Sequence, residues 1–487
     1  MLQLAAVSYK KNNLTYLLAF TLILYLSINF LIRIAFSQTM QLDDAEQIRL
    51  SQELALGYPI PQPPLYSWLS WGLFQLIGTG LLALTLLKYL LISLTFWLIW
   101  LSSDYLFRHQ QTRILATLSL LLLPSFAWHM HQGFTHTILL GLAIAMTLHA
   151  LLRLPQHHTT VDYLYLGSAL GIGLMAKYSF LLLMIPLLLS ALTIREYRKP
   201  LLQPTIWVTI AAITLWITPH LYWLSQHYQE IYSSIDQKLQ VTHKNLLQTR
   251  LTSLWGFLTS AIAFVTPWVL LYALFSSRQL LNSRKRTHPP STQLLSRFYW
   301  IVLISVVLLS LFFAMPHFKV RWFHPLMMLF PLWWLSRIES DDAPSNPLVR
   351  WAALFTLALS LLIISVRLLQ LTVGPELGHY GRLNRPIIET LEQLPTPPQS
   401  TLLKTNDHFL GAHLLSHYPN HSIAIQTKLY QRDLSLPLEN CLLFWDNDEA
   451  SSPPTLHHAT AQKEQTTKVG KVQYRLNTAQ SPNTECP

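Results

Sequence analysis

The chain is poor in charged residues. Only 12% of its 487 residues are Asp, Glu, Lys or Arg, whereas 51% are hydrophobic and the mean hydropathy is +0.31. Soluble domains carry about twice this share of charge, so the composition excludes an ordinary soluble protein and predicts that most of the chain lies in lipid. The net charge of +11 does not indicate nucleic-acid binding, because Lys and Arg stand in short connections and form no continuous basic face. Anionic lipid headgroups are the expected partner.

Further features are missing from the sequence. The first apolar stretch, which follows Lys10 and Lys11, has no small-residue cleavage site and is too long for a signal peptide, so we expect a retained membrane anchor. The chain has no internal repeat, which argues against a transporter built from inverted repeats. It also has no nucleotide-binding loop.

Cysteine is scarce as well. The two cysteines, Cys441 and Cys486, both lie near the C-terminus. One disulfide is expected if this part of the chain lies in an oxidising compartment, and two free thiols are the alternative.

Long apolar stretches dominate the first three quarters of the chain. An apolar helix needs about 20 residues to cross a bilayer. By this measure we expect about eleven membrane spans, and the charged Lys88 and Asp104 are interpreted as snorkelling or helix-end residues. The expected spans begin near Leu14, Leu81, Ile114, Thr137, Asp162, Tyr178, Thr205, Leu251, Phe298, Trp322 and Trp351.

The distribution of cations between the spans predicts an orientation. With the N-terminus inside, alternate loops are rich in Lys and Arg, which is typical of cytoplasmic loops. The opposite loops hold fewer cations: Arg49 lies in the first, none lies between His129 and His136, and Lys319 and Arg321 lie in the fifth. The loop after the first span and the segment after the last span are therefore both expected outside. The cation-rich loops contain Arg108, Arg113, Arg153, Arg195, Arg198, Lys199, Arg284, Lys285, Arg286, Arg337 and Arg350.

The last segment has a different composition. From residue 373 onward the chain is richer in polar residues and proline, and "HSIAIQ" and "CLLFWD" alternate as strands do, whereas "RPIIETLEQL" has a helical pattern. We therefore expect a polytopic α-helical membrane domain over 1–372, with a first outer loop over 37–80, and a small α/β domain outside the membrane over 373–487.

The first outer loop, "QLDDAEQIRLSQELALGYPIPQPPLYSWL", carries an acidic pair. Asp43 and Asp44 begin a segment that favours an interfacial helix as far as Leu56. Capping of the helix N-terminus explains such a pair without any catalytic role. The following Gly57, Tyr58 and proline cluster instead predict a stiff segment that holds a carboxylate in place.

These motifs carry a resemblance to a known family. The acidic pair, followed by Pro-Pro-Leu-Tyr and a Trp, resembles the first outer loop of bacterial GT-C glycosyltransferases of the glycosyltransferase 39 or PMT_2 group. This group includes aminoarabinose transferases that act on lipid A and is related to protein O-mannosyltransferases. The elements "GLMAKYSFLLL" and "HFKVRWFHPLMMLFPLW" are similar to the family's lysine element and its late basic element. The eleven spans and the C-terminal domain also fit the GT-C type.

The resemblance implies an inverting transferase in the bacterial cytoplasmic membrane, with its site on the periplasmic side. It would move a sugar from a polyprenyl phosphate to an envelope acceptor such as lipid A or lipopolysaccharide, without a cofactor. Asp43 matches the leading acid of the family's pair and is the expected general base. Asp44 stands where the family usually has Glu, and it is expected to assist.

The resemblance also implies binding residues. Lys177, Lys319 and Arg321 are expected to bind the donor phosphate, with snorkelling of Lys177 and headgroup anchoring of the other two as alternatives. Contacts to acceptor or lipid are expected from the side chains that surround the proline cluster, namely Tyr58, Gln62 and Tyr66.

The sequence departs from the family at several positions. Glu46 replaces the arginine of aminoarabinose transferases, and Trp322 replaces a tyrosine. Pro61 and Gln62 replace an acidic-basic pair, so no metal is assigned. The outer-loop histidines His129, His131, His136, His227 and His243 have no convincing metal-ligand spacing and suit interfacial positions.

Three other functions remain open at this point. The chain could be a protein O-glycosyltransferase, a flippase or transporter of lipid-linked sugars, or a non-catalytic assembly scaffold. An acidic pair on an outer interfacial helix favours catalysis over binding at the membrane midplane.

Overall fold

The computed structural model describes most of the chain. The described residues are 2–239, 254–266, 288–312, 323–339, 346–378, 381–426, 428–430, 440–446, 461–469 and 471–482, together with Arg250, Thr252, Trp268, Val269 and Leu438.

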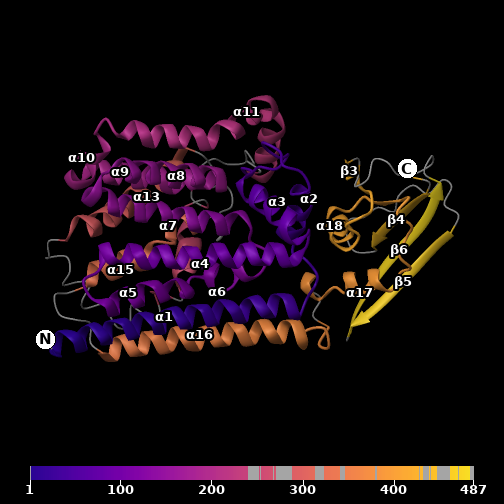
Figure 1. Cartoon of the computed structure of the whole chain (residues 1–487), viewed down its shortest axis with the longest axis horizontal. Coiled ribbons are helices and arrows are strands. Elements are labelled where there is room, and N and C mark those ends of the chain that lie inside the picture. The colour runs from indigo at the N-terminus through magenta and orange to yellow at the C-terminus, as the bar shows by residue number, and fades with distance from the viewer. Residues whose placement is uncertain are drawn as a thin grey trace.

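Long helices lie side by side and form the larger part of the molecule (Figure 1). The N-terminal helix α1 and the late helix α16 run next to each other along one side, and the short helices α2 and α3 lie at the end of the bundle that faces the C-terminal sheet. The helices of the bundle are α1 (Leu2–Ala35), α2 (Leu42–Leu50), α3 (Leu65–Ile77), α4 (Leu81–Leu106), α5 (Gln110–Leu118), α6 (Pro124–Ala127), α7 (His136–His157), α8 (Thr160–Ala176), α9 (Leu181–Thr193), α10 (Arg195–Leu201), α11 (Ile206–Leu239), α13 (Pro290–Phe312), α14 (His324–Met327), α15 (Phe330–Ile338) and α16 (Asn346–Thr372). Short 3₁₀ segments, η1 (Ser119–Leu122), η2 (His129–His131) and η3 (Tyr178–Phe180), connect some of them.

In the part of the chain that the structure describes, fewer helices than expected are long enough to span a membrane. Within the described ranges, six helices have the required length and apolar composition, or eight if each of two bent pairs counts as one span. The segment expected to span from Ile114 is bent by 70° before Pro124, and the one from Tyr178 is bent by 107° before Arg195. The segment expected from Trp322 contains two short helices, α14 and α15. The polytopic helical class is thus confirmed, whereas the count of eleven is not.

Exposed apolar side chains cover the long helices. Phe20 of α1, Trp97 of α4, Leu215 of α11 and Leu361 of α16 are each more than half exposed. An aqueous surface would not carry so many large apolar side chains, so lipid is the solvent of this region.

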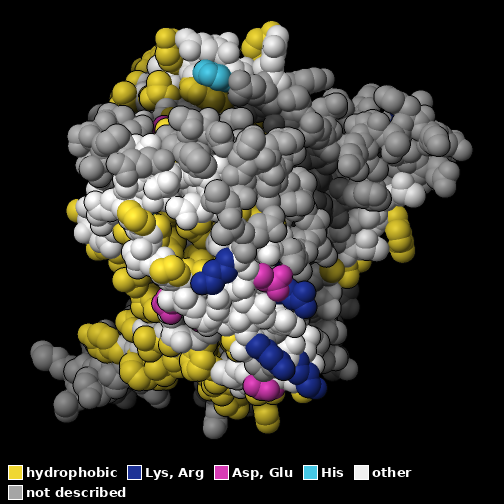
Figure 2. Space-filling model, turned by 90° about the vertical axis from the view of Figure 1, so that its right-hand side faces the viewer, with side chains coloured by type: hydrophobic (Ala, Val, Ile, Leu, Met, Phe, Trp, Pro, Cys, Tyr) yellow, Lys and Arg dark blue, Asp and Glu magenta, His cyan; other side chains and the backbone are white. Residues whose placement is uncertain are grey.

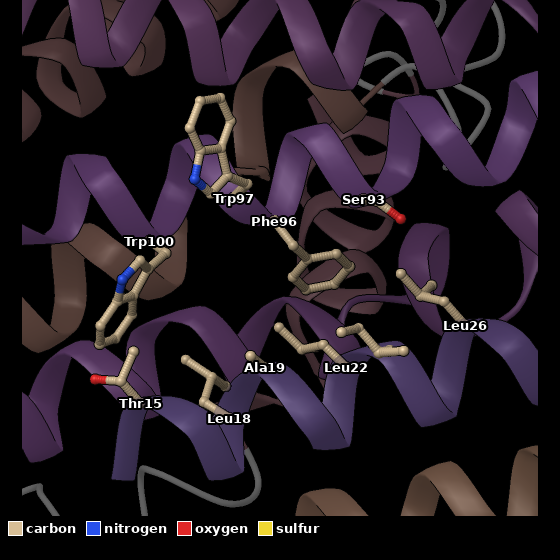
Figure 3. Close-up of a pocket in the computed structure, with 10 residues that line it drawn as sticks. Thr15, Leu18, Ala19, Leu22, Leu26, Ser93, Phe96, Trp97 and Trp100 are labelled. Carbon is tan, nitrogen blue, oxygen red and sulfur yellow. The ribbon is translucent and has the colours of Figure 1, made fainter. Parts of the chain in front are cut away.

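An apolar pocket lies between α1 and α4 in this region. Figure 3 shows Leu18 and Leu22 of α1 on one side, with Phe96 and Trp100 of α4 opposite them. The pocket measures about 190 Å³ and has an almost entirely hydrocarbon lining, so it suits an apolar chain and not a sugar.

The C-terminal residues form a six-stranded sheet in the order β3-β2-β1-β4-β6-β5. Strand β1 pairs in parallel with β2 and β4, whereas the other pairs are antiparallel. Helix α18 forms the crossover between β1 and β2, as parallel pairing requires. The predicted strands and helix are confirmed as β2, β4 and α17. The elements are η5 (Arg382–Asn384), α17 (Ile387–Glu392), β1 (Thr401–Thr405), α18 (His408–His417), β2 (Ile423–Ile425), β3 (Lys428–Tyr430), β4 (Asn440–Asp446), β5 (Ala461–Val469) and β6 (Val472–Pro482).

The sheet domain packs directly on the first loop. Met40, Ala45 and Ile48 share a buried apolar cluster with Leu410 and other residues of the sheet domain. The Met40 backbone N–H also donates to His413 Nε2 of α18 at 3.1 Å. The first loop and the C-terminal domain therefore lie on the same side of the bundle, as predicted.

The sheet end of the molecule differs from the bundle in its surface. Figure 2 views the molecule from this end and shows charged side chains of both signs on its central and lower part, with apolar side chains at the margins. Cys441 in β4 is buried and disulfide-bonded, which supports the disulfide alternative, and Cys486 lies outside the described residues.

Candidate active site

Helix α2 places the acidic pair at the junction of bundle and sheet domain. Its start is fixed by a capping box in which the Asp44 carboxylate reaches back to the Gln41 backbone N–H at 3.5 Å. The helix ends at Leu50, six residues before the expected end at Leu56, so that expectation was wrong. The chain beyond Leu50 instead turns back on itself, and the Tyr58 hydroxyl donates to the Glu53 carbonyl at 2.9 Å.

Asp44 is buried between two cations. Its carboxylate lies 3.2 Å from the Lys88 ammonium of α4 and 3.6 Å from the Arg33 guanidinium of α1, and all three side chains are at most 2% exposed. The interpretation of Lys88 as a snorkelling residue was therefore wrong, because its ammonium lies in the interior. A buried carboxylate needs such partners to stay charged.

Both cations have further partners that orient them. Lys88 donates to the Gln132 carbonyl at 2.7 Å, and Arg33 donates to the carbonyls of Ser37 and Thr39 at 2.8 and 2.9 Å. Arg33 thereby satisfies carbonyls just beyond the end of α1. The ion cluster Arg33–Asp44–Lys88 joins α1, α2 and α4 at one point.

Asp43 has a different environment from Asp44. It is half-buried, and its charge acts on Tyr66 and Lys88. Gln47 lies one turn after Asp43 on the same face of α2, and its amide lies 3.0 Å from His136 Nε2 of α7. The Ser67 hydroxyl of α3 donates to the other end of this amide at 2.8 Å. Asp43 therefore faces α3 and α7 from the first turn of α2.

Lys177 lies close to the same part of α7. It follows the end of α8 in an extended conformation, and its ammonium donates to Thr137 Oγ1 at 2.8 Å. Thr137 is the neighbour of His136, which Gln47 contacts. The structure thus connects Gln47 of α2 and Lys177 through the first residues of α7. Lys319 and Arg321, the other predicted phosphate ligands, lie outside the described residues.

The proline-rich part of the loop is held against α11. The Leu56 carbonyl is 3.2 Å from His220 Nδ1, and His220 Nε2 is 2.8 Å from the Tyr178 hydroxyl. A Cβ atom at Gly57 would lie 2.3 Å from the Trp223 ring, so only glycine allows this close approach. These contacts hold the loop in place, in agreement with the prediction of a stiff segment.

The three predicted acceptor or lipid contacts have different positions. Tyr58 is buried and bonded within the loop, and burial raises the pKa of its hydroxyl. Gln62 is half-buried, and its Oε1 has no partner among the described residues. Tyr66 is fully buried with its ring 5.5 Å from that of His136, and its hydroxyl also has no partner in the described part of the chain. Burial, followed by the charges of Asp44 and Asp43, raises the pKa of Tyr66 well above its ordinary value. Tyr66 is therefore the predicted contact nearest to the acidic pair.

The histidines near the site make ordinary structural contacts. His131 lies between the hydroxyls of Tyr25 and Tyr89, at 2.8 and 3.0 Å, and its carbonyl accepts from Arg367 of α16. Over the described residues, no group of three His, Cys, Asp or Glu side chains could hold a metal ion. His243 lies outside the described residues.

Sequence reasoning missed Arg33, Lys88, Gln47 and His136 as parts of the site. A signal existed for Lys88, since a lysine in the middle of an apolar helix requires a partner in lipid. No comparable signal identified the partner, because Lys88 and Asp44 belong to different helices.

Comparisons with known proteins identify relatives of this chain. The family model described as dolichyl-phosphate-mannose-protein mannosyltransferase, PMT_2, matches residues 61–223. The lipopolysaccharide core galacturonosyltransferase RgtB of Rhizobium johnstonii is 30% identical over 80% of this chain and 78% of its own length. The core galacturonosyltransferase RgtA of the same organism is 26% identical over 82% and 80%.

Solved structures show the same fold. ArnT from Cupriavidus metallidurans bound to undecaprenyl phosphate matches with a TM-score of 0.63 over 94% of this chain and 97% of its own, at 12% identity. Its apo state matches with a TM-score of 0.61. The identity and coverage of RgtB, together with the family model and the shared fold, establish that the chain belongs to the PMT_2 family of GT-C glycosyltransferases.

Proposed function

We propose that this chain is a membrane glycosyltransferase that moves galacturonic acid from a polyprenyl phosphate to the core of lipopolysaccharide. The observation that carries the proposal is the unequal acidic pair. Asp44 is buried between two cations, whereas Asp43 is half-buried beside it and faces the part of α7 that contacts Lys177. RgtB and RgtA are named as lipopolysaccharide core galacturonosyltransferases, which supports galacturonic acid as the sugar and the core as the acceptor. The undecaprenyl phosphate bound to ArnT supports a polyprenyl phosphate as the lipid carrier.

The residues have separate roles in the proposed reaction. An acceptor hydroxyl attacks the anomeric carbon while the bond from that carbon to the phosphate oxygen breaks. Asp43 accepts the hydroxyl proton, and Lys177 stabilises the charge of the departing polyprenyl phosphate, helped by Lys319 and Arg321. A single displacement inverts the anomeric centre. Asp44 does not touch the acceptor in this scheme but fixes the first turn of α2 through Arg33 and Lys88.

The reaction is placed on the outer face of the cytoplasmic membrane. The cation-rich alternate loops support this orientation. A cysteine at exposed Lys468 of β5 should react with a membrane-impermeant maleimide in intact spheroplasts. A cysteine at exposed Glu196 of α10, on a loop predicted to be inside, is the matched control and should react only after lysis. The reverse pattern would contradict the orientation.

Purified protein tests the activity directly. We expect it to convert polyprenyl-phosphate galacturonate and a truncated lipopolysaccharide core into free polyprenyl phosphate and a core heavier by one uronic acid, detected by mass spectrometry. A flippase would move the donor between leaflets without releasing free lipid phosphate. Transfer to a peptide hydroxyl and not to the core would favour the protein O-glycosyltransferase alternative.

A further inference from the structure

His324 is a buried polar side chain without a hydrogen-bond partner. It begins α14, its side chain is fully buried, and neither ring nitrogen has a partner among the described residues. The rings of Phe126 and Phe264 lie 5.7 and 6.4 Å from it. Buried polar atoms in proteins are almost always paired, so two unpaired nitrogens on one imidazole require an explanation such as a ligand.

The position of His324 relates it to the candidate active site. A Cβ atom at Gly141 of α7 would lie 3.2 Å from His324 Nε2, so His324 packs beside Gly141. Thr137, which accepts from Lys177, lies one turn before Gly141 on the same face of α7. The Lys177 ammonium is also close enough to act electrostatically on the His324 ring. Lys177 and His324 thus both contact the same face of α7.

Gly141 contributes to this arrangement by having no side chain. Any larger residue would place its Cβ 3.2 Å from Nε2, closer than ordinary van der Waals contact, so the His324 ring would have to shift. Glycine in a helix interior costs up to about 1 kcal/mol relative to alanine. Close packing of the His324 ring on α7 accounts for the glycine.

The chemistry of the pair selects an anion. An imidazole offers at least one N–H donor, and an ammonium offers three. A carboxylate accepts hydrogen bonds through both oxygens and donates none, and its bonds to a cation are stronger than those of a neutral hydroxyl. A sugar carboxylate therefore suits Lys177 and His324 better than the hydroxymethyl group of a neutral hexose.

We propose that His324, next to the phosphate-binding Lys177, recognises the carboxylate of the uronosyl group in the donor and so determines which sugar is transferred. This inference rests on the proposed function. It assigns His324 to the sugar and not to the phosphate, because every polyprenyl-phosphate donor carries the phosphate whereas only a uronosyl donor carries the carboxylate.

Two donors with the same lipid test the assignment, namely polyprenyl-phosphate galacturonate and polyprenyl-phosphate galactose. We expect the purified wild-type protein to prefer the galacturonate donor by about 100-fold or more in kcat/KM. His324→Leu should lower kcat/KM for galacturonate by about 10- to 100-fold and leave that for galactose within about 2-fold. His324→Gln, which retains an N–H donor, should restore part of the preference.

Two further variants control for stability. His149→Leu also removes a buried imidazole, which belongs to α7 itself. His149 is paired with the Tyr165 hydroxyl at 3.2 Å and lies more than three turns from Thr137, so the donor preference should persist in this variant. Gly141→Ala places a methyl group 3.2 Å from His324 Nε2 and displaces the ring without removing it, so it should reduce the preference even if His324→Leu fails to fold.

The outcomes separate the two proposals. A wild-type protein that transfers neither sugar contradicts the proposed function. Three results would overturn the assignment of His324 and leave the transferase activity intact: transfer by the wild type without a preference for galacturonate, equal losses with both donors in His324→Leu, or a preference that survives this substitution. Where His324→Leu does not fold, a preference that survives Gly141→Ala has the same meaning.

Discussion

Asp44→Asn tests whether the buried ion cluster holds the first loop. The substitution keeps the size of the side chain and removes its charge. It leaves Lys88 and Arg33, which lie 3.2 and 3.6 Å from the carboxylate, as buried cations without a counter-charge. Loss of one partner from a buried ion pair costs about 3–5 kcal/mol. Both cations keep carbonyl acceptors, so we expect the free energy of unfolding to fall by about 3 kcal/mol, at the lower end of this range.

The exposed ion pair of Asp104 and Arg113 provides a matched control. Their atoms lie only 2.5 Å apart, but the Asp104 side chain is 66% exposed. Solvent screens such a pair, so Asp104→Asn should cost less than about 1 kcal/mol. Burial, and not distance, therefore decides the expected difference between the two aspartates.

Denaturant unfolding in detergent micelles, followed by tryptophan fluorescence, measures both variants. The double variant Asp44→Asn with Lys88→Met should be more stable than the sum of the single losses predicts, by at least about 1 kcal/mol, because it removes a cation together with its counter-charge. Equal stability of Asp44→Asn and Asp104→Asn, or strict additivity in the double variant, would refute the argument.

Three further predictions concern the reaction and the sheet domain. Asp43→Asn should lower transfer by about 10²–10⁴-fold with little change in melting temperature, and wild-type turnover would remove its role as general base. Lys177→Met should lower kcat/KM by about 10- to 100-fold with either sugar donor, whereas unchanged kinetics would return Lys177 to a snorkelling role. Burial lowers the pKa of His413 from 6.5 to about 4, so His413 binds a proton more readily when the sheet domain is undocked. The attachment of the sheet domain to the first loop should therefore weaken by about 3 kcal/mol as the pH falls from 6.5 to 4. Hydrogen exchange of the Met40 backbone N–H measures this change, and His413→Gln should remove the pH dependence.

Much of the architecture could be predicted from the sequence because it depends on local patterns. Apolar stretches identify membrane helices, and alternation identified β2 and β4 in the sheet domain. The bends before Pro124 and Arg195 were not predicted, because an apolar stretch has the same composition whether it crosses the membrane straight or turns back. Apolar composition alone therefore does not determine the number of spans.

The site was predictable only in part, for a related reason. Asp43 and Lys177 stand in motifs that resemble those of the family, so the sequence pointed to both. The partners of Asp44 come from α1 and α4, and the contact from Met40 to His413 joins residues 373 positions apart. Such pairs depend on how separate elements meet, and a single sequence carries no record of that.

The contact between the first loop and the sheet domain also bears on how the protein is made. Helix α2 is among the first segments to leave the membrane, yet Leu410 and His413, which cover it, belong to the last fifth of the chain. Until those residues have been synthesised, the apolar side chains of Met40, Ala45 and Ile48 have no cover. The enzyme therefore cannot assemble its site progressively from the N-terminus, and a nascent chain that stalls before the sheet domain is expected to be inactive and a substrate for quality-control proteases.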